Sequence, residues 1–221
     1  VQVAPQRYIV GEMHQNSAAR YTILLSHGNA EDLGDLGPVA RFMVENGFSV
    51  FAYDYEGYGR SSAGASESAV NDDVLAAFDY LVNERKIPAH RIIAYGRSIG
   101  GGPAVELATR RPVAALALES TFRSAFRVAT KVKLVPFDAF DNGSKLNRVH
   151  CPVLVMHGKR DSVIAFWHGE YLFSAASEPK RFLAVDQADH MDVIWLAGKR
   201  WVDSMHELER LADNAAGVPI P

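Results

Sequence analysis

The sequence predicts an α/β fold with a mostly parallel central sheet and helices on both faces. Short apolar runs, as expected of strands buried on both faces, alternate along the chain with stretches of helical periodicity. Strands that alternate with helices connect through crossovers, and crossovers join parallel neighbours. The chain has 221 residues, no internal repeat and no Pro/Gly-rich linker, so we predict a single domain over residues 1–221.

The first half of the chain contains three predicted strands and two predicted helices. The strands are residues 3–13, which we expect at an edge, 21–26 and 48–53. Residues 37–46 are predicted to form a helix that ends before Gly47. Residues 68–86 are predicted to form an amphipathic helix, because their apolar side chains recur at helical spacing. Those side chains are Val70, Val74, Leu75, Phe78, Leu81 and Val82.

The second half alternates in the same way. Its predicted strands are residues 91–95, 113–118, 153–156 and 181–185, and its predicted helices are residues 99–110, 165–176 and 192–211. The stretch 119–150 is the least regular, and its roughly thirty residues exceed what a simple crossover needs. We expect this stretch to form a small cap, although its apolar side chains would alternatively complete the core. Those side chains are Phe122, Phe126, Val132, Leu134, Val135 and the apolar part of segment 137–140.

The composition excludes several classes of function. Lys and Arg total 23 and Asp and Glu total 26, so the net charge of −3 offers no basic footprint for nucleic acid. No apolar stretch reaches the roughly 18 residues of a membrane-spanning helix, and no signal peptide is visible. The single cysteine, Cys151, agrees with a reducing compartment, so we expect a cytoplasmic location. Because the chain begins at Val1 rather than Met, this expectation leaves open an upstream leader or membrane anchor.

One motif indicates nucleophilic chemistry. Residues 96–100, GRSIG, match G-x-S-x-G and lie between a predicted strand and a predicted helix. In that context a sharp turn lifts the serine hydroxyl above the carboxyl ends of the strands. The flanking glycines suit the turn because a Cβ would clash there. We therefore predict that Ser98 is a nucleophile.

A serine nucleophile needs a base, and the base needs an acid that orients it. With this type of turn the order along the chain is serine, acid, histidine. His190 follows the last predicted strand, where the base belongs, and Asp161 follows the penultimate strand, where the acid belongs. Asp186, Asp189 and Asp192 are rivals for the acid. Asp189 is directly adjacent to His190, which disfavours a well-aligned hydrogen bond between the two side chains, and Asp192 is expected to start the last helix.

Attack on a carbonyl also requires hydrogen-bond donors for the oxyanion. Residues 26–30, SHGNA, follow the first strongly apolar strand, where such a loop belongs. We predict that the donors are the backbone N–H groups of Ile99 and Asn29, with Ala30 as the alternative to Asn29.

Other kinds of site are disfavoured. Cys151 precedes Pro152 at a strand entrance and is typical of buried packing. His and Asp never cluster at a ligand spacing such as H-E-x-x-H, so we expect no metal and no cofactor. Residues 57–59, GYG, lack the full phosphate-loop pattern and are predicted to form a turn near the mouth of the site.

Five segments together carry a family resemblance. They are HGNAEDLG at 27–34, YDYEGYGRSS at 53–62, YGRSIGG at 95–101, FDAF at 137–140 and CPVLVMHGKRDSVI at 151–164. They resemble the Bem46-like branch of the α/β-hydrolases, to which the mammalian protein depalmitoylases are related. The resemblance implies the α/β-hydrolase fold, Ser98 as nucleophile, Asp161 as acid, His190 as base and residues 27–29 as the oxyanion loop. Two features depart from the branch: Met191 separates His190 from Asp192, and the cysteine-rich N-terminal segment of the animal depalmitoylases is absent from this chain.

The sequence therefore predicts hydrolysis of a carboxylic ester or thioester, with a short to medium acyl chain, through an acyl-enzyme. The expected substrate is a small-molecule or lipid-like acyl ester, or an acylated protein. Peptide or amide hydrolysis by the same three residues is the alternative among enzymes. A non-catalytic binding module of the same fold is the alternative outside them, and the oligomeric state is left open.

Overall fold

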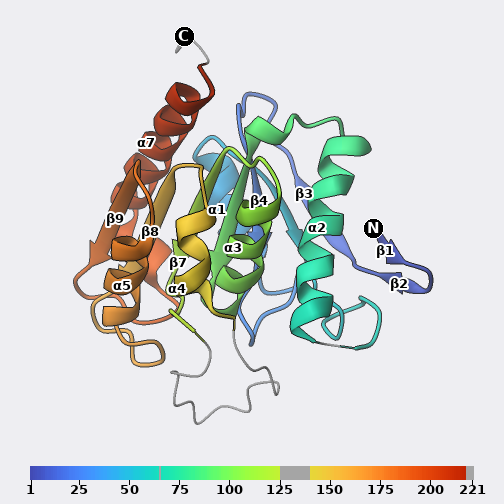
Figure 1. The fold of residues 1–221 in the computed structure, drawn as a ribbon, viewed down its shortest axis with the longest axis horizontal. Coiled ribbons are helices and arrows are strands. Elements are labelled where there is room, and N and C mark those ends of the chain that lie inside the picture. Colours follow the sequence, from blue (N-terminus) through green and yellow to red (C-terminus); the bar gives the residue numbers. More distant parts are fainter. Residues whose placement is uncertain (65, 125–139, 218–221) are drawn as a thin grey trace.

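The structure is a computed structural model, and it describes residues 1–64, 66–124 and 140–217. Within these residues, one seven-stranded sheet has the order β3-β5-β4-β6-β7-β8-β9, and only the β3–β5 pair is antiparallel. The predicted α/β architecture is therefore confirmed (Figure 1). The strands are β3 (Gly11–His14), β4 (Thr22–Ser26), β5 (Ser49–Tyr53), β6 (Ile92–Arg97), β7 (Ala115–Glu119), β8 (Val153–Gly158) and β9 (Lys180–Val185).

Helices bury both faces of the sheet, as Figure 1 shows. One face is covered by α2 (Glu67–Asn83), α3 (Gly101–Arg110) and α5 (Trp167–Ala175), with the short α4 (Asn142–Lys145) beside α3. The other face is covered by α1 (Gly37–Glu45), α6 (Val193–Ala197) and α7 (Lys199–Ala216). Because both faces are buried, the central strands β4, β5 and β8 are apolar along nearly their whole length instead of alternating.

Two predicted elements were wrong in detail. In place of one edge strand over residues 3–13, β1 (Gln2–Ala4) and β2 (Arg7–Tyr8) pair with each other, and β3 alone joins the main sheet. In place of one closing helix, α6 and α7 meet at Gly198, whose φ of +50° and ψ of −117° are not helical. Glycine reaches this conformation without a Cβ clash, and the helical periodicity on both sides conceals the break.

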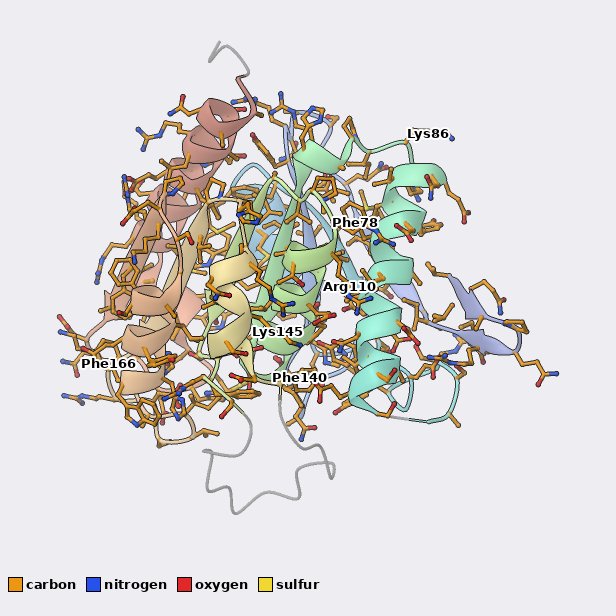
Figure 2. All side chains as sticks on the ribbon, in the orientation of Figure 1. Phe78, Lys86, Arg110, Phe140, Lys145 and Phe166 are labelled. Atoms are coloured by element: carbon orange, nitrogen blue, oxygen red, sulfur yellow. The ribbon has the colours of Figure 1, made fainter. Side chains whose placement is uncertain are left out.

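The stretch after β7 is described at its two ends. Phe140 packs on α3: a Cβ added to Gly102 of this helix would lie 2.3 Å from the Phe140 ring. Glu106 of α3 forms ion pairs with Arg110 of the same helix, at 2.6 Å, and with Lys145 of α4, at 2.7 Å (Figure 2). The ion pair with Lys145 links α4 to α3. Of the side chains expected in the cap, Phe122 and Phe140 are buried, and Phe126, Val132, Leu134, Val135 and residues 137–139 lie outside the described part of the chain.

Candidate active site

Ser98 lies in a tight turn between β6 and α3. Its φ is +53°, in the left-handed region that a residue with a Cβ adopts only at a cost in energy. A single 3₁₀ turn, Ser98–Gly100, leads into α3. A Cβ on Gly96 would lie 2.4 Å from the carbonyl oxygen of Gly100, and a Cβ on Gly100 would lie 2.1 Å from that of Ser26. The turn therefore requires both glycines, and it has the strand–turn–helix context that the sequence predicts.

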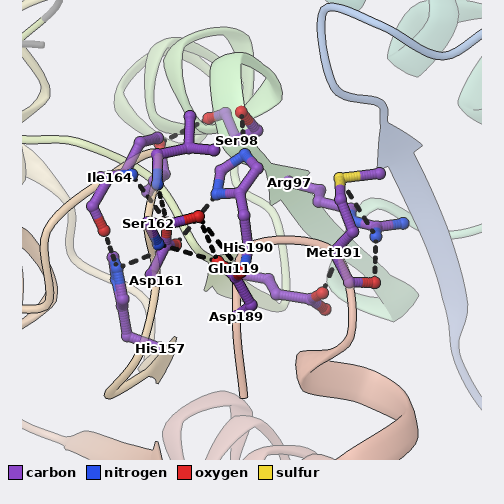
Figure 3. Close-up of polar contacts among 12 residues, drawn as sticks. Arg97, Ser98, Glu119, His157, Asp161, Ser162, Ile164, Asp189, His190 and Met191 are labelled. Atoms are coloured by element: carbon purple, nitrogen blue, oxygen red, sulfur yellow. Dashed lines mark hydrogen bonds and ion pairs between the residues drawn. The ribbon is translucent and has the colours of Figure 1, made fainter. Parts of the chain in front are cut away.

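The hydroxyl of Ser98 lies within hydrogen-bond distance of the imidazole of His190. Oγ of Ser98 is 2.9 Å from Nε2 of His190, and Nδ1 of the same ring is 2.9 Å from Oδ2 of Asp161 (Figure 3). When the neutral ring carries its proton on Nδ1, it donates to Asp161 and accepts from Ser98. The structure thus brings together three residues that lie 92 and 29 positions apart in the sequence.

The buried carboxylate of Asp161 accepts several hydrogen bonds. Its Oδ1 accepts the backbone N–H groups of Val163 at 2.9 Å and Ile164 at 2.7 Å, and its Oδ2 lies 3.3 Å from Nε2 of His157. Burial by itself raises the pKa of Asp161, but the hydrogen bonds from His157, His190 and Ile164 outweigh it and hold the pKa below its ordinary value. Asp161 is therefore ionised at neutral pH, as the partner of an imidazolium must be.

The three rival carboxylates make other contacts. Asp189 accepts the backbone N–H groups of Ser162 at 2.8 Å and of His190 at 2.7 Å, so it connects two loops through their backbone. Asp192 precedes α6 and accepts the backbone N–H of Asp189 at 2.7 Å. Asp186 forms an ion pair with a lysine at the surface.

The loop that contains Asn29 borders Ser98. A Cβ added to Gly28 would lie 3.6 Å from the Cβ of Ser98. The side-chain oxygen of Asn29 accepts the hydroxyl of Tyr58 at 2.7 Å, and no acceptor among the described residues receives its backbone N–H. Ile99 lies in the first helical turn, where N–H groups lack intrahelical partners. Both predicted donors are therefore backbone N–H groups on segments next to Ser98.

Tyr58 belongs to the GYG segment, and the turn predicted there is present. Gly57 and Gly59 have φ values of +87° and +47°, and a Cβ on Gly59 would collide with the carboxylate of Asp54. The buried ring of His27 contacts the ring of Tyr58. Nδ1 of His27 lies 2.7 Å from the carbonyl oxygen of Gly28. Burial lowers the pKa of His27, so its ring is neutral. The neutral ring packs under the loop and contacts the backbone of Gly28.

Sequence reasoning missed a buried charged cluster beside this turn. Arg97 ends β6, is 4% exposed, and lies between Glu31 at 3.0 Å and Glu119 at 3.6 Å. Its guanidinium also donates to the carbonyl oxygen of Met191 at 2.8 Å (Figure 3). The available signal was a charged residue at the end of an otherwise apolar strand. His157, whose Nε2 lies 3.3 Å from Oδ2 of Asp161, was also missed.

Neither a metal-binding cluster nor a reactive cysteine thiol is found in the part of the chain that the structure describes. Within residues 1–64, 66–124 and 140–217, no three His, Cys, Asp or Glu side chains are placed to hold a metal ion. Burial raises the pKa of the Cys151 thiol to about 12, so the thiol stays protonated at neutral pH. None of the helices in these same residues is both long enough and apolar enough to cross a bilayer.

Comparisons with curated proteins identify relatives of this chain. The family model described as serine aminopeptidase, S33, matches residues 17–140, more than half of the chain. The alpha/beta hydrolase domain-containing protein aho-3 of Caenorhabditis elegans is 42% identical over 79% of this chain and 54% of its own length. The human alpha/beta hydrolase domain-containing protein 17B is 42% identical over 79% of this chain and 62% of its own length. This chain thus spans 54% to 62% of the length of these two relatives.

Solved structures share the fold at low sequence identity. A monoacylglycerol lipase of Paleococcus ferrophilus has a TM-score of 0.71 at 19% identity, over 93% of this chain and 99% of its own. A sugar hydrolase (YeeB) of Lactococcus lactis has a TM-score of 0.77 at 16% identity, over 94% of this chain and 96% of its own. The family match, the curated relatives and the fold agree with the resemblance of the sequence motifs. The chain belongs to the α/β-hydrolase family, in its Bem46-like branch.

Proposed function

We propose that this protein is a serine hydrolase that cleaves carboxylic esters or thioesters of short to medium acyl chains through an acyl-enzyme. The observation that carries the proposal is the hydrogen-bonded series from Ser98 through His190 to the buried Asp161, with both distances 2.9 Å. The series begins at a serine whose φ is +53°. Backbone strain of this kind persists where the surrounding structure fixes it, and it is frequent at reactive residues.

In the acylation half of the reaction, Oγ of Ser98 bonds to the carbonyl carbon of the substrate while Nε2 of His190 takes the hydroxyl proton. The electron pair of the carbonyl bond moves to the oxygen, where the N–H groups of Ile99 and Asn29 stabilise it. Asp161 stabilises the imidazolium through Nδ1. The tetrahedral intermediate then collapses, and the alcohol or thiol leaves with the proton from His190.

In the deacylation half, His190 takes a proton from water, and the water oxygen bonds to the acyl carbon. Collapse of the second intermediate returns the proton to Oγ of Ser98 and releases the carboxylic acid. The four groups that the reaction needs are a nucleophile, a base, an acid and oxyanion donors. All four are supplied by side chains and backbone of this chain, so the proposal requires no cofactor.

Two features bear on the bond that is cleaved. The resemblance to the depalmitoylase-related branch supports an acyl ester or thioester, with a lipid-like molecule or an acylated protein as the substrate. The family description, a serine aminopeptidase, favours a second candidate, the hydrolysis of a peptide or amide bond by the same residues.

Three substrates that carry the same butyryl group but differ in the bond to be cleaved separate these candidates. They are p-nitrophenyl butyrate, a butyryl thioester and p-nitrobutyranilide. We expect the ester and the thioester to be turned over at least about 100-fold faster than the anilide, and Ser98→Ala to lower each rate by about 1,000-fold or more. Ser68→Ala, at an exposed serine of α2, should change nothing. A faster anilide reaction would favour the amidase. Absence of turnover by folded protein would favour the non-catalytic module.

A further inference from the structure

Arg97 directly precedes Ser98, and its guanidinium contacts two separate loops. The side chain is 5% exposed. One arm, Nη1, donates to Oε1 of Glu31 at 3.0 Å, and the other, Nη2, donates to the carbonyl oxygen of Met191 at 2.8 Å. Figure 3 shows this side chain reaching Met191, the residue after His190. A planar guanidinium holds two partners at a fixed relative geometry, which a flexible ammonium does not do.

Both contacts connect Arg97 to groups that the proposed reaction uses: Met191 is one residue from His190, and Glu31 is one hydrogen bond and one residue from Asn29. Met191 follows His190, so the bond to its carbonyl fixes the backbone that carries the base. Glu31 accepts the backbone N–H of Gly28 through its second oxygen, Oε2, at 2.9 Å. Gly28 precedes Asn29, so the series from Arg97 through Glu31 fixes the backbone that presents the oxyanion donor.

A second buried carboxylate lies near the guanidinium without a hydrogen bond to it. Nε of Arg97 lies 3.6 Å from Oε1 of Glu119. The other oxygen of Glu119 accepts the hydroxyl of Tyr95, and that hydroxyl accepts Nε1–H of Trp201 at 3.1 Å. Trp201 is fully buried at the start of α7. A buried positive charge needs nearby carboxylates of this kind to offset the loss of solvation.

We propose that Arg97 is a positioning residue, whose guanidinium holds the His190 loop and the Gly28–Asn29 loop in register with Ser98. The inference rests on the proposed function, because it assigns a role through His190 and the N–H of Asn29. Displacing reactive groups by about 1 Å can cost about 100-fold in rate. A merely structural ion pair would instead contribute to stability and leave the turnover of folded enzyme unchanged.

The test compares Arg97→Met and Arg97→Lys with a matched control. Arg20 lies just before the amino end of β4, at the opposite end of the sheet from Ser98, and forms a 2.7 Å ion pair with the buried Asp213. Its side chain is 37% exposed, against 5% for Arg97, so Arg20→Met tests the loss of an ion pair to a buried carboxylate that is remote from the reaction. With p-nitrophenyl butyrate we expect Arg97→Met to lower kcat by about 10- to 100-fold with KM within about threefold. Arg97→Lys should restore part of kcat. Arg20→Met should lower the melting temperature and keep kcat within about twofold of wild type.

A second variant decides the matter even if Arg97→Met fails to fold. In Glu31 one carboxylate oxygen accepts from Arg97 and the other accepts from Gly28. Glu31→Gln keeps the volume of the side chain but replaces one of these two oxygens with an NH₂ group, which cannot accept. We expect a loss in kcat of about threefold or more. In proton NMR, the Nδ1 proton that His190 shares with Asp161 should broaden in Arg97→Met and in no Arg20 variant.

The outcomes separate this inference from the proposed function. If wild type hydrolyses the ester and Ser98→Ala does not, but Arg97→Met or Glu31→Gln retains full kcat, the positioning role is wrong and the hydrolase stands. A fall in kcat that matches the fall in folded fraction would likewise overturn it. If wild type hydrolyses none of the three substrates, the proposed function fails, and the positioning role fails with it.

Discussion

Nδ1 of His190 lies 2.9 Å from Oδ2 of Asp161, whereas the carboxylate of the adjacent Asp189 accepts the backbone N–H of His190 at 2.7 Å. Two carboxylates thus hold one histidine, but only one of them contacts its ring. Asp189 fixes where the loop lies, and Asp161 fixes which ring nitrogen carries the proton. The two residues should therefore respond very differently to the same isosteric substitution.

Asp161→Asn should keep the fold and lower kcat by about 100- to 10,000-fold. The new amide would present its NH₂ group to Nδ1 and force the ring proton onto Nε2, where it blocks acceptance of the Ser98 proton. Asp189→Asn should cost less than about threefold, because the amide oxygen can still accept the backbone N–H groups of Ser162 and His190. Steady-state kinetics of both variants, with circular dichroism to check folding, would measure this. The reverse ranking would move the acid to Asp189.

Asp73 should make the stability of the fold decrease toward alkaline pH. Its carboxyl is fully buried in α2, where Oδ2 accepts the backbone N–H of Glu56, and burial raises its pKa to about 7. An unfolded Asp titrates near 3.9, so between these values the folded protein retains a proton that the unfolded chain has lost. The contribution of Asp73 to the free energy of unfolding is therefore fully present below about pH 4. It is lost as the pH rises toward about 7, at a rate of up to about 1.4 kcal/mol per pH unit.

Asparagine at position 73 does not titrate, which isolates this effect. The free energy of unfolding of Asp73→Asn minus that of wild type should increase from pH 5 to pH 7 in urea titrations. Asp79→Asn, at a half-exposed position of the same helix, is the control and should give a constant difference. A constant difference for Asp73→Asn as well would show that Asp73 is ionised in the folded protein.

Gly198 should be intolerant of a side chain for a reason of backbone geometry alone. An added Cβ would meet nothing closer than 3.6 Å, but the φ of +50° with a ψ of −117° is a conformation that L-residues avoid. Gly198→Ala should therefore lower the free energy of unfolding by about 1–3 kcal/mol. Gly37→Ala, at the open start of α1, should be neutral or stabilising by up to about 1 kcal/mol. Thermal denaturation measures both, and equal effects would refute the argument.

Acyl-chain length should have a limited effect on the rate. The small cap predicted for residues 119–150 would leave a shallow groove, so kcat/KM for p-nitrophenyl esters should rise by at most about fourfold for each CH₂ and then level off at medium length. The series runs from acetate to palmitate, below the micelle concentrations. A continuous rise to palmitate would indicate an enclosed tunnel. Activity on acetate alone would indicate a small closed pocket.

The sequence predicted those parts of the fold that rest on local patterns. The central strands are continuous apolar runs, and every strand from β4 to β9 was predicted to within a few residues. Ser98, Asp161 and His190 were predicted to be nucleophile, acid and base from chain order and from a strand–turn–helix motif, both of which can be read without coordinates. The structure places the three side chains within hydrogen-bond distance of one another in series. The break at Gly198 escaped because a single glycine interrupts neither the apolar pattern of α6 nor that of α7.

Contacts between distant buried charges could not be predicted in this way. Arg97 meets residues 66 positions before it and 94 positions after it, and no local pattern encodes that convergence. Hydrophobic periodicity assigns charged residues to the surface, so Glu31, Glu119 and Arg97 would each be placed there. Their burial becomes intelligible only when the sheet brings the ends of β4, β6 and β7 together.

Labelling by a fluorophosphonate tests the central claim most directly, because this reagent bonds covalently to a serine that an adjacent base has activated. Wild-type protein would be incubated with the reagent, digested and mapped by mass spectrometry, with Ser98→Ala and Ser68→Ala treated in parallel. We predict one adduct, on Ser98, which is lost in Ser98→Ala, unchanged in Ser68→Ala and formed much more slowly in Asp161→Asn. An adduct on another residue, or none on folded wild-type protein, would contradict the assignment of Ser98, His190 and Asp161 as the reacting group.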